Sequence, residues 1–221
     1  FWDIAFNIGS TVATLAQGIT LGALLQGIVV QDRGYAGGWF DWLTPFSLLV
    51  GVSLVCGYGL LGATWLIMKS EGSLQERCYR LAFRLGIAVI LAMAAVSAWT
   101  PFLREAYWLR WFAWPQVLFT AQVPLLVVIA SATFFLSLRR QHHYTPFLMA
   151  LALFTLGLAG LGVSLYPYVV PPAVSIWDAA APDVSLKFML PGVLVMVPII
   201  LAYTGYSYWV FRGKTGHEGY H

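Results

Sequence analysis

Charged residues are scarce in this chain. They make up 10 % of its 221 residues, whereas roughly a quarter of residues are charged in a soluble domain. Hydrophobic residues make up 60 %. A water-soluble protein of this composition would have an apolar surface, so we infer that the surrounding solvent is lipid. The net charge of +3, with aromatic residues that are not interleaved with basic clusters, argues against nucleic-acid binding.

Histidine is missing from every long apolar stretch. His142 and His143 lie in a short polar turn, and His217 and His221 lie in the C-terminal tail. The i, i+4 spacing of the last two is typical of a metal-binding pair, but a short glycine-containing tail favours a mobile chain end. A haem in a membrane bundle needs axial ligands inside the bundle, usually His or Met. We interpret the methionines of the apolar stretches as packing residues, because no second ligand faces them: Met93, Met149 and Met196. The sequence thus predicts neither a metal site nor a haem ligand in this chain.

Cysteine and signal features are also sparse. Cys56 falls in an apolar stretch and Cys78 in a predicted polar connector, which argues against a disulfide between them. No cleavable signal peptide is evident. The chain begins with Phe1 and enters an apolar stretch almost at once, so we expect N-terminal spans of the natural protein to precede it.

Six apolar stretches are long enough to cross the hydrocarbon layer, which takes about 20 helical residues. Backbone groups in lipid must bond internally, which favours helices. The sequence therefore predicts an all-α fold, a polytopic transmembrane helix bundle forming one integral-membrane domain over residues 1–221. The predicted spans are Trp2–Val30, Pro45–Met68, Leu81–Thr100, Pro115–Leu138, Pro146–Tyr166 and Leu186–Phe211.

Local signals mark helix ends and helix contacts. Thr44 and Thr145 each precede a proline and are predicted N-caps. Pro101 and Pro167 are expected just beyond their helices, and Pro124, Pro191 and Pro198 are expected to kink theirs. Small residues predict close helix packing, and two glutamines predict interhelical hydrogen bonds. These residues are Gly18, Gly22, Gly59, Ala63, Gly157, Gly160 and Gly162, with Gln17 and Gln26.

Basic residues are distributed unequally between the two ends of the predicted bundle, which indicates its orientation. One end carries eight: Lys69, Arg77, Arg80, Arg84, Arg139, Arg140, Arg212 and Lys214. The other end carries four: Arg33, Arg104, Arg110 and Lys187. We therefore expect the C-terminus, and the start of the first span, to face the cytoplasm. Aspartates and an aromatic belt mark the outer end: Asp32, Asp41, Asp178 and Asp183, with Trp39, Trp42, Trp108, Trp111, Trp114 and Trp177.

Asp3 is the one acidic residue near the interior of an apolar span. It lies at the start of the first predicted helix. One interpretation is a carboxylate that is favoured at a helix N-terminus. The other is a proton-uptake group, since a half-buried carboxylate can exchange protons. Asp3 is the only candidate for a proton pathway. No catalytic residue is predicted in this chain, and no cofactor-binding residue can be named.

Several dispersed motifs resemble subunit II of cytochrome bd-type quinol oxidases. Their residues are most similar to those of the cyanide-insensitive branch. The resemblance covers essentially all 221 residues, which align with the C-terminal two-thirds of that subunit. The motifs are Trp2-Asp3, Ile8–Ser10, Gly22–Gly27, Leu43–Phe46, Gly62–Thr64, Tyr166–Pro172, Ile176–Ala180, Pro198–Thr204 and Tyr206–Trp209.

The resemblance implies a haem-free subunit of a terminal oxidase in the bacterial cytoplasmic (inner) membrane, a complex that oxidises quinol and reduces O₂ to water. Family members have eight spans. Two b-type haems and one d-type haem, or a third b-type haem, are expected in the partner, subunit I. Subunit II supports that partner, completes the proton path and in some members binds a structural quinone. Lipid is a further expected partner, and the resemblance leaves open a small single-span subunit.

Two other classes of protein fit the composition. A secondary transporter or permease would use the proline-containing spans to line a cavity, but its midplane positions are usually polar, and here they are nearly all apolar. A non-catalytic membrane scaffold is separated from the oxidase subunit only by the family motifs.

Overall fold

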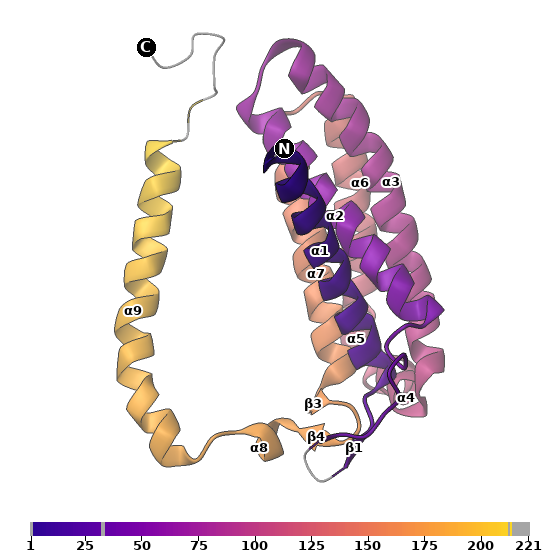
Figure 1. Cartoon of the computed structure of the whole chain (residues 1–221). Helices are drawn as coiled ribbons and strands as arrows, with labels where there is room; N and C mark the ends of the chain where they lie inside the picture. Colours follow the sequence, from indigo (N-terminus) through magenta and orange to yellow (C-terminus); the bar gives the residue numbers. More distant parts are fainter. Residues whose placement is uncertain (1, 32–33, 212, 214–221) are drawn as a thin grey trace.

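The computed structural model describes residues 2–31, 34–211 and 213, and its fold is an all-α bundle, as predicted (Figure 1). Six long apolar helical segments have the length and composition to cross a membrane. They are α1 (Trp2–Gln26), α2 (Pro45–Lys69), α3 (Gly72–Leu103), α5 with α6 (Val117–Thr120 and Gln122–Arg139), α7 (Thr145–Leu165) and α9 (Asp183–Val210). The connections contain α4 (Glu105–Phe112), α8 (Ile176–Ala179) and the strands β1 (Val30–Gln31), β2 (Gly34–Tyr35), β3 (Tyr168–Val170) and β4 (Val174–Ser175).

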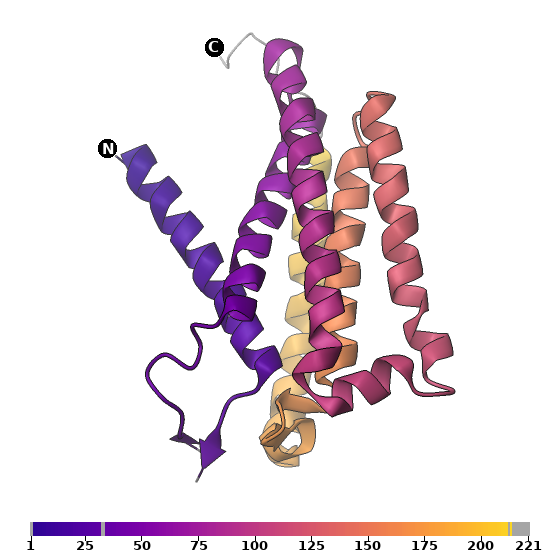
Figure 2. The ribbon, with the colours of Figure 1, turned by 90° about the vertical axis from the view of Figure 1, so that its right-hand side faces the viewer.

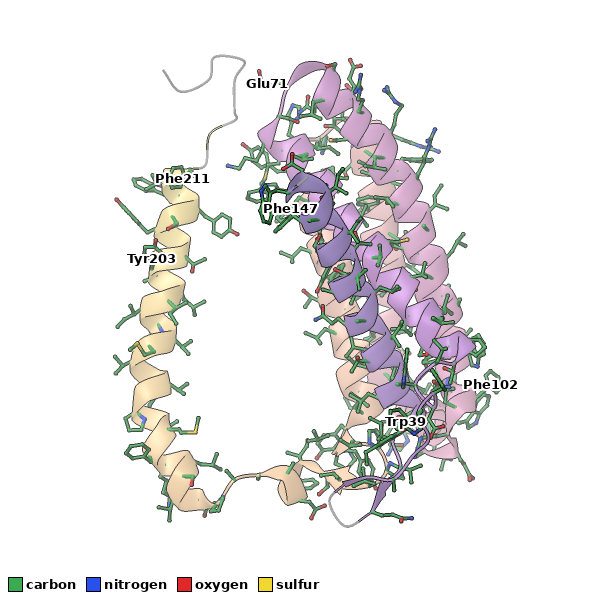
Figure 3. The ribbon with its side chains drawn as sticks, in the orientation of Figure 1. Trp39, Glu71, Phe102, Phe147, Tyr203 and Phe211 are labelled. Carbon is green, nitrogen blue, oxygen red and sulfur yellow. The ribbon has the colours of Figure 1, made fainter. Side chains whose placement is uncertain are left out.

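The two ends of the bundle differ in chemistry. The first, here called the basic end, holds the start of α1, the α2–α3 and α6–α7 turns and the end of α9. The opposite end, here called the belt end, holds α4, α8 and two antiparallel strand pairs, β1–β2 and β3–β4. Figure 3 shows Glu71 at the basic end, and Trp39 and Phe102 at the belt end. Four charged residues used in the orientation prediction lie outside the described residues: Asp32 and Arg33 of the predicted outer end, and Arg212 and Lys214 of the predicted cytoplasmic end.

Helix α2 is the centre of the bundle, because α1, α3 and α7 all pack against it. Thr44 caps it as predicted: its side chain accepts the Ser47 N–H, and the Ser47 hydroxyl accepts the Thr44 N–H. The buried core joins α2 to α3, α6 and α7 through Leu60, Ile67, Ala82, Phe134 and Ala150, among others.

Helices α1 and α2 meet where both lack large side chains. A Cβ atom on Gly22 would lie 2.5 Å from the Cα of Ser47, and one on Gly18 would lie 2.7 Å from the Cα of Gly51. Towards its start, α1 leans away from α2 (Figure 2), and its first twelve residues are exposed. The predicted small-residue contact is therefore confirmed at Gly18 and Gly22, and it holds only the second half of α1. In α7 the prediction fails at Gly162, where nothing lies within 4 Å.

The third span begins earlier than predicted. Helix α3 starts at Gly72 and continues through Pro101 to Leu103, so residues 72–80 are helical and Cys78 is buried rather than part of a polar connector. Arginines at 77, 80 and 84 lowered the hydropathy of this stretch. They are exposed, whereas Cys78, Ala82 and Gly86 face the core at i, i+4 spacing. At 32 residues, α3 is about 48 Å long and exceeds the hydrocarbon thickness.

Other predicted boundaries also change. The first span ends at Gln26 instead of Val30, and the fourth is interrupted at Ala121. Pro124 explains the interruption, because it has no N–H for the carbonyl of Thr120. The last span begins at Asp183, not Leu186, and helix α7 begins at Thr145, so Tyr144 rather than Thr145 takes its N-cap position.

Helix α9 stands apart from the other helices (Figure 1). None of its residues is buried by the described part of the chain. At the basic end, the ring of Tyr208 packs edge-on against Trp65 with centroids 5.8 Å apart, and Lys69 Nζ donates to the carbonyl oxygen of Phe211 at 2.5 Å. Figure 3 shows Phe147 and Phe211 near this end, and the ring of Phe147 also packs edge-on with Trp65, with centroids 5.2 Å apart.

The close contact of α1 and α2 predicts a position-specific effect of a single methyl group. Gly22→Ala should lower the free energy of unfolding by roughly 1–3 kcal/mol, because the added Cβ meets backbone that cannot move aside. Gly9→Ala is the matched control on the same helix, since nothing lies within 4 Å of that position. Thermal unfolding of the purified protein measures both, and equal midpoints for the two variants would contradict the packing described.

Candidate functional site

Asp3 lies in the first turn of α1 at the basic end, where its carboxylate is exposed. Within residues 2–31, 34–211 and 213 it takes part in no hydrogen bond or ion pair. Its position agrees with both interpretations, a carboxylate at a helix N-terminus and a proton-uptake group.

Polar side chains continue from Asp3 along one face of α1. Asn7, Ser10, Thr14 and Gln17 follow at alternating steps of four and three residues, which place them above one another on a helix. Ser10 donates to the carbonyl of Asn7 at 3.1 Å, and Thr14 donates to that of Ser10 at 2.8 Å. We call these five residues the α1 polar stripe. Sequence analysis missed it, although its heptad-like spacing was a readable signal.

Both predicted glutamines make interhelical hydrogen bonds. The Tyr58 hydroxyl of α2 donates to Gln17 Oε1 at 3.3 Å, and the Thr44 hydroxyl donates to Gln26 Oε1 at 2.6 Å. The prediction is confirmed for both residues. Through the first bond, the stripe ends on the phenol of Tyr58, about 20 Å along the helix from Asp3, at a position where both side chains are exposed.

At the belt end, two arginines of α4 and its N-cap hydrogen-bond to the last carbonyls of two transmembrane helices. The Arg104 guanidinium donates from Nε and Nη2 to the carbonyl of Gln26 at 3.2 and 3.1 Å. Arg110 Nη1 donates to the carbonyls of Ser164 at 2.8 Å and Val163 at 3.3 Å. The last carbonyls of a helix have no intrahelical partner and carry partial negative charge, so cations are favoured there. Two arginines thereby fix the ends of α1 and α7.

Neutral hydrogen bonds support the two arginines. The buried Tyr107 hydroxyl donates to the carbonyl of Leu25 at 2.8 Å, and Trp111 Nε1 donates to Ser164 Oγ at 3.0 Å. Burial raises the pKa of Tyr107, and the positive charges of Arg104 and Arg110 oppose that rise. Tyr107 therefore remains a hydrogen-bond donor at neutral pH.

Gly27 connects two of the motifs that are far apart in the sequence. Its φ of +95° ends α1, and its N–H donates to the carbonyls of Leu24 at 3.0 Å and Ala23 at 3.1 Å. A Cβ atom here would overlap the Arg104 guanidinium and lie 2.8 Å from the carbonyl oxygen of Pro171. The Gly22–Gly27 and Tyr166–Pro172 motifs therefore meet at one glycine that has no room for a side chain.

The motif around Asp178 has a local structural role. The Asp178 carboxylate accepts hydrogen bonds from the Ser175 hydroxyl and N–H, at 2.5 and 3.2 Å, and so completes the capping box of the short helix α8, whose N-cap is Ser175. These bonds lower the pKa of Asp178. Because the folded pKa is depressed, the cap is present at neutral pH and is lost as the pH falls through that lowered value.

The described histidines belong to the α6–α7 turn. The carbonyl of His142 accepts a hydrogen bond from the Tyr79 hydroxyl at 3.1 Å, and His143 Nδ1 lies 3.1 Å from Gln75 Nε2. His217 and His221 lie outside the described residues. In the part of the chain that the structure covers, no group of three or more His, Cys, Asp or Glu residues is arranged to hold a metal ion. Met93 and Met149 pack against the buried core, whereas Met196 on α9 is exposed.

Comparison with known proteins matches this chain to the family model "Cytochrome bd terminal oxidase subunit II" over residues 1–211. The chain belongs to this family. It is 26 % identical to the cytochrome bd-I ubiquinol oxidase subunit 2 of Escherichia coli K12 over 98 % of its length, and 23 % identical to the cytochrome bd ubiquinol oxidase subunit 2 of Bacillus subtilis over 98 %. A probable cytochrome oxidase subunit 2 of Haemophilus influenzae is 27 % identical over 96 %. The chain spans 66 %, 64 % and 65 % of the lengths of these relatives, respectively.

Membership of the subunit II family confirms the resemblance that the motifs indicated. The structure adds a physical reason for two of those motifs. Gly27 leaves room for the Arg104 guanidinium that donates to the last carbonyl of α1, and the Pro171 carbonyl lies beside the same glycine. The named motifs thus include residues that hold the belt end together.

The crowding at Gly27 predicts a loss of stability beyond that of its backbone conformation. Gly27→Ala should cost roughly 1–3 kcal/mol more than Gly72→Ala, because the new Cβ displaces Arg104 from the end of α1. Gly72 is the matched control: it also has a positive φ, +66°, but nothing lies within 4 Å of it. Thermal unfolding of the two variants separates the backbone strain at a positive φ from the displacement of the Arg104 side chain. Equal losses of stability in the two variants would contradict the proposed role of the Arg104 contact.

Proposed function

We propose that this chain is subunit II of a bacterial membrane complex that oxidises quinol and reduces O₂ to water, with the haems held by a partner subunit. The family match over residues 1–211 carries the proposal. Because the chain covers less than two thirds of its relatives, the activity, substrates and partners of the whole protein belong to this proposal.

The positions of the histidines and methionines support a haem-free role. His142 and His143 are tied into a turn at the basic end, and Met93 and Met149 fill the core. An axial ligand needs a free imidazole nitrogen or thioether facing a haem-sized space inside the bundle. The haems, two of b type and one of d type or b type alone, are therefore assigned to the partner, subunit I.

We place the basic end in the cytoplasm of the bacterium, in its inner membrane. The described basic residues there outnumber those at the belt end, as the positive-inside rule requires. Asp3 then lies on the side from which protons for water are taken. Polar groups along a membrane helix are costly unless water or protein covers them, so the α1 polar stripe favours water or a partner protein beside it. Its hydroxyl and amide groups then offer a hydrogen-bonded path for a proton from Asp3. A structural quinone, lipid and a small single-span subunit are further proposed partners.

The haem assignment predicts that histidine changes in this chain leave the haem spectra intact. His142→Ala and His143→Ala, each in the complex purified with its haem-bearing subunit, should retain every absorption band of the reduced enzyme, because neither side chain reaches a haem. A reduced-minus-oxidised spectrum makes the measurement. Loss of one haem band from a single variant would assign a haem to this chain.

The proton role of Asp3 predicts a loss of turnover without loss of haem. Asp3→Asn should slow quinol-driven O₂ consumption by roughly tenfold or more, because the amide cannot exchange a proton. Asp183→Asn is the matched control: it removes an exposed carboxylate from the first turn of another membrane helix, α9, at the belt end. Asp3→Glu should recover most of the rate. Unchanged turnover in Asp3→Asn would leave Asp3 with the helix-terminal role alone.

A further inference from the structure

An arginine-rimmed groove runs between α3 and α6 at the basic end. It consists of two adjoining hollows of about 560 and 280 Å³, which share Phe83 and Arg139. We call it the arginine groove. Its apolar wall contains Phe83, Ile87, Ala132, Phe135 and Leu136, and its rim contains Arg80, Arg84 and Arg139.

The groove exists because α3 and α6 touch at few points. Their close approach is at Gly86, where a Cβ atom would lie 2.5 Å from the ring of Phe134. Beside it, the rings of Phe83 and Phe135 pack edge-on with centroids 5.4 Å apart. Figure 2 shows α3 and α6 standing side by side with α7 behind the space between them. The residues that line the groove come from α3 and α6 alone.

The rim is positively charged without a local counter-ion. Across the described ranges, Arg80, Arg84 and Arg139 make no hydrogen bond or ion pair, and no carboxylate lines either hollow. Glu76 lies one turn before Arg80 on α3 but is not part of the lining. Three guanidinium groups thus surround the mouth of an apolar groove, and they favour an anion that carries an apolar tail.

We propose that the arginine groove binds one anionic phospholipid. Its phosphate lies among Arg80, Arg84 and Arg139, and an acyl chain lies along Ile87 and Ala132 towards the membrane interior. Ile87 follows Arg84 by three residues, about 4.5 Å further along α3, which matches the step from headgroup to acyl chain. Basic pockets between membrane helices recognise lipid headgroups in this way. The site depends on the membrane location of the chain and not on its proposed oxidase function.

Charge-matched variants test the headgroup contact. The purified complex is reconstituted into vesicles that contain equal amounts of phosphatidylglycerol and phosphatidylcholine, and is then extracted. Native mass spectrometry counts the lipid molecules that it retains. Arg80→Gln with Arg139→Gln should weaken phosphatidylglycerol retention roughly 30-fold, since each arginine contributes about a factor of five at a membrane surface. Arg77→Gln with Arg140→Gln removes the same charge outside the groove and should leave retention nearly unchanged. Equal effects of the two pairs, or no effect of the first, would overturn the proposal.

A second pair of variants tests the acyl chain without changing charge. Ala132→Phe fills the apolar wall and should also abolish retention of the lipid, whereas Ala94→Phe, at an exposed position of α3 outside the groove, should retain it. If Ala132→Phe retains the lipid, the acyl chain does not lie in the groove. If it releases the haem-bearing subunit while the lipid count stays the same, the groove is a protein interface and the proposal fails.

Discussion

The belt end depends on two cations that satisfy helix carbonyls. Helices α1 and α7 end where the chain leaves the membrane, and their last carbonyls have no partner within the helix. Arg104 and Arg110, at the start and near the end of α4, supply the missing donors. Since α4 continues directly from α3, these bonds join three membrane helices through eight residues of interfacial helix. The carbonyl of Pro171 also lies close to this junction, since a Cβ atom on Gly27 would meet both it and Arg104.

Much of this fold could be predicted from the sequence, because lipid imposes a simple requirement of about 20 apolar residues per span. All six spans follow from it, whereas the Thr44 cap and the Gly18–Gly22 contact follow from local sequence signals. The start of α3 could not be predicted this way. Its arginines face outward while Cys78 and Ala82 face the core, so average hydropathy failed where helical periodicity would have succeeded. The interruption at Ala121 follows from Pro124, but the sequence does not reveal that the chain would break there rather than bend.

The candidate site was less predictable. Asp3 was recognisable as a single acid beside an apolar span, and Gln17 and Gln26 as hydrogen-bonding residues. The role of Arg104 and Arg110 in bonding to the last carbonyls of α1 and α7 was not recognisable, because the sequence identifies them only as basic residues of a loop at the outer end. Their partners lie more than fifty residues away in the chain, and tertiary structure alone pairs them. Local spacing could have revealed the α1 polar stripe, since its five residues lie within one helix.

Helix α9 has a consequence for how its sequence changes over time. Within the described chain it is held by its covalent link and by contacts at the basic end around Trp65 and Lys69. A residue that buries no surface against its own chain is under no packing constraint from it. Selection on most of this helix must therefore come from whatever surrounds it in the membrane. Which faces of α9 vary among relatives, and which do not, would map those neighbours without any structure of the complex.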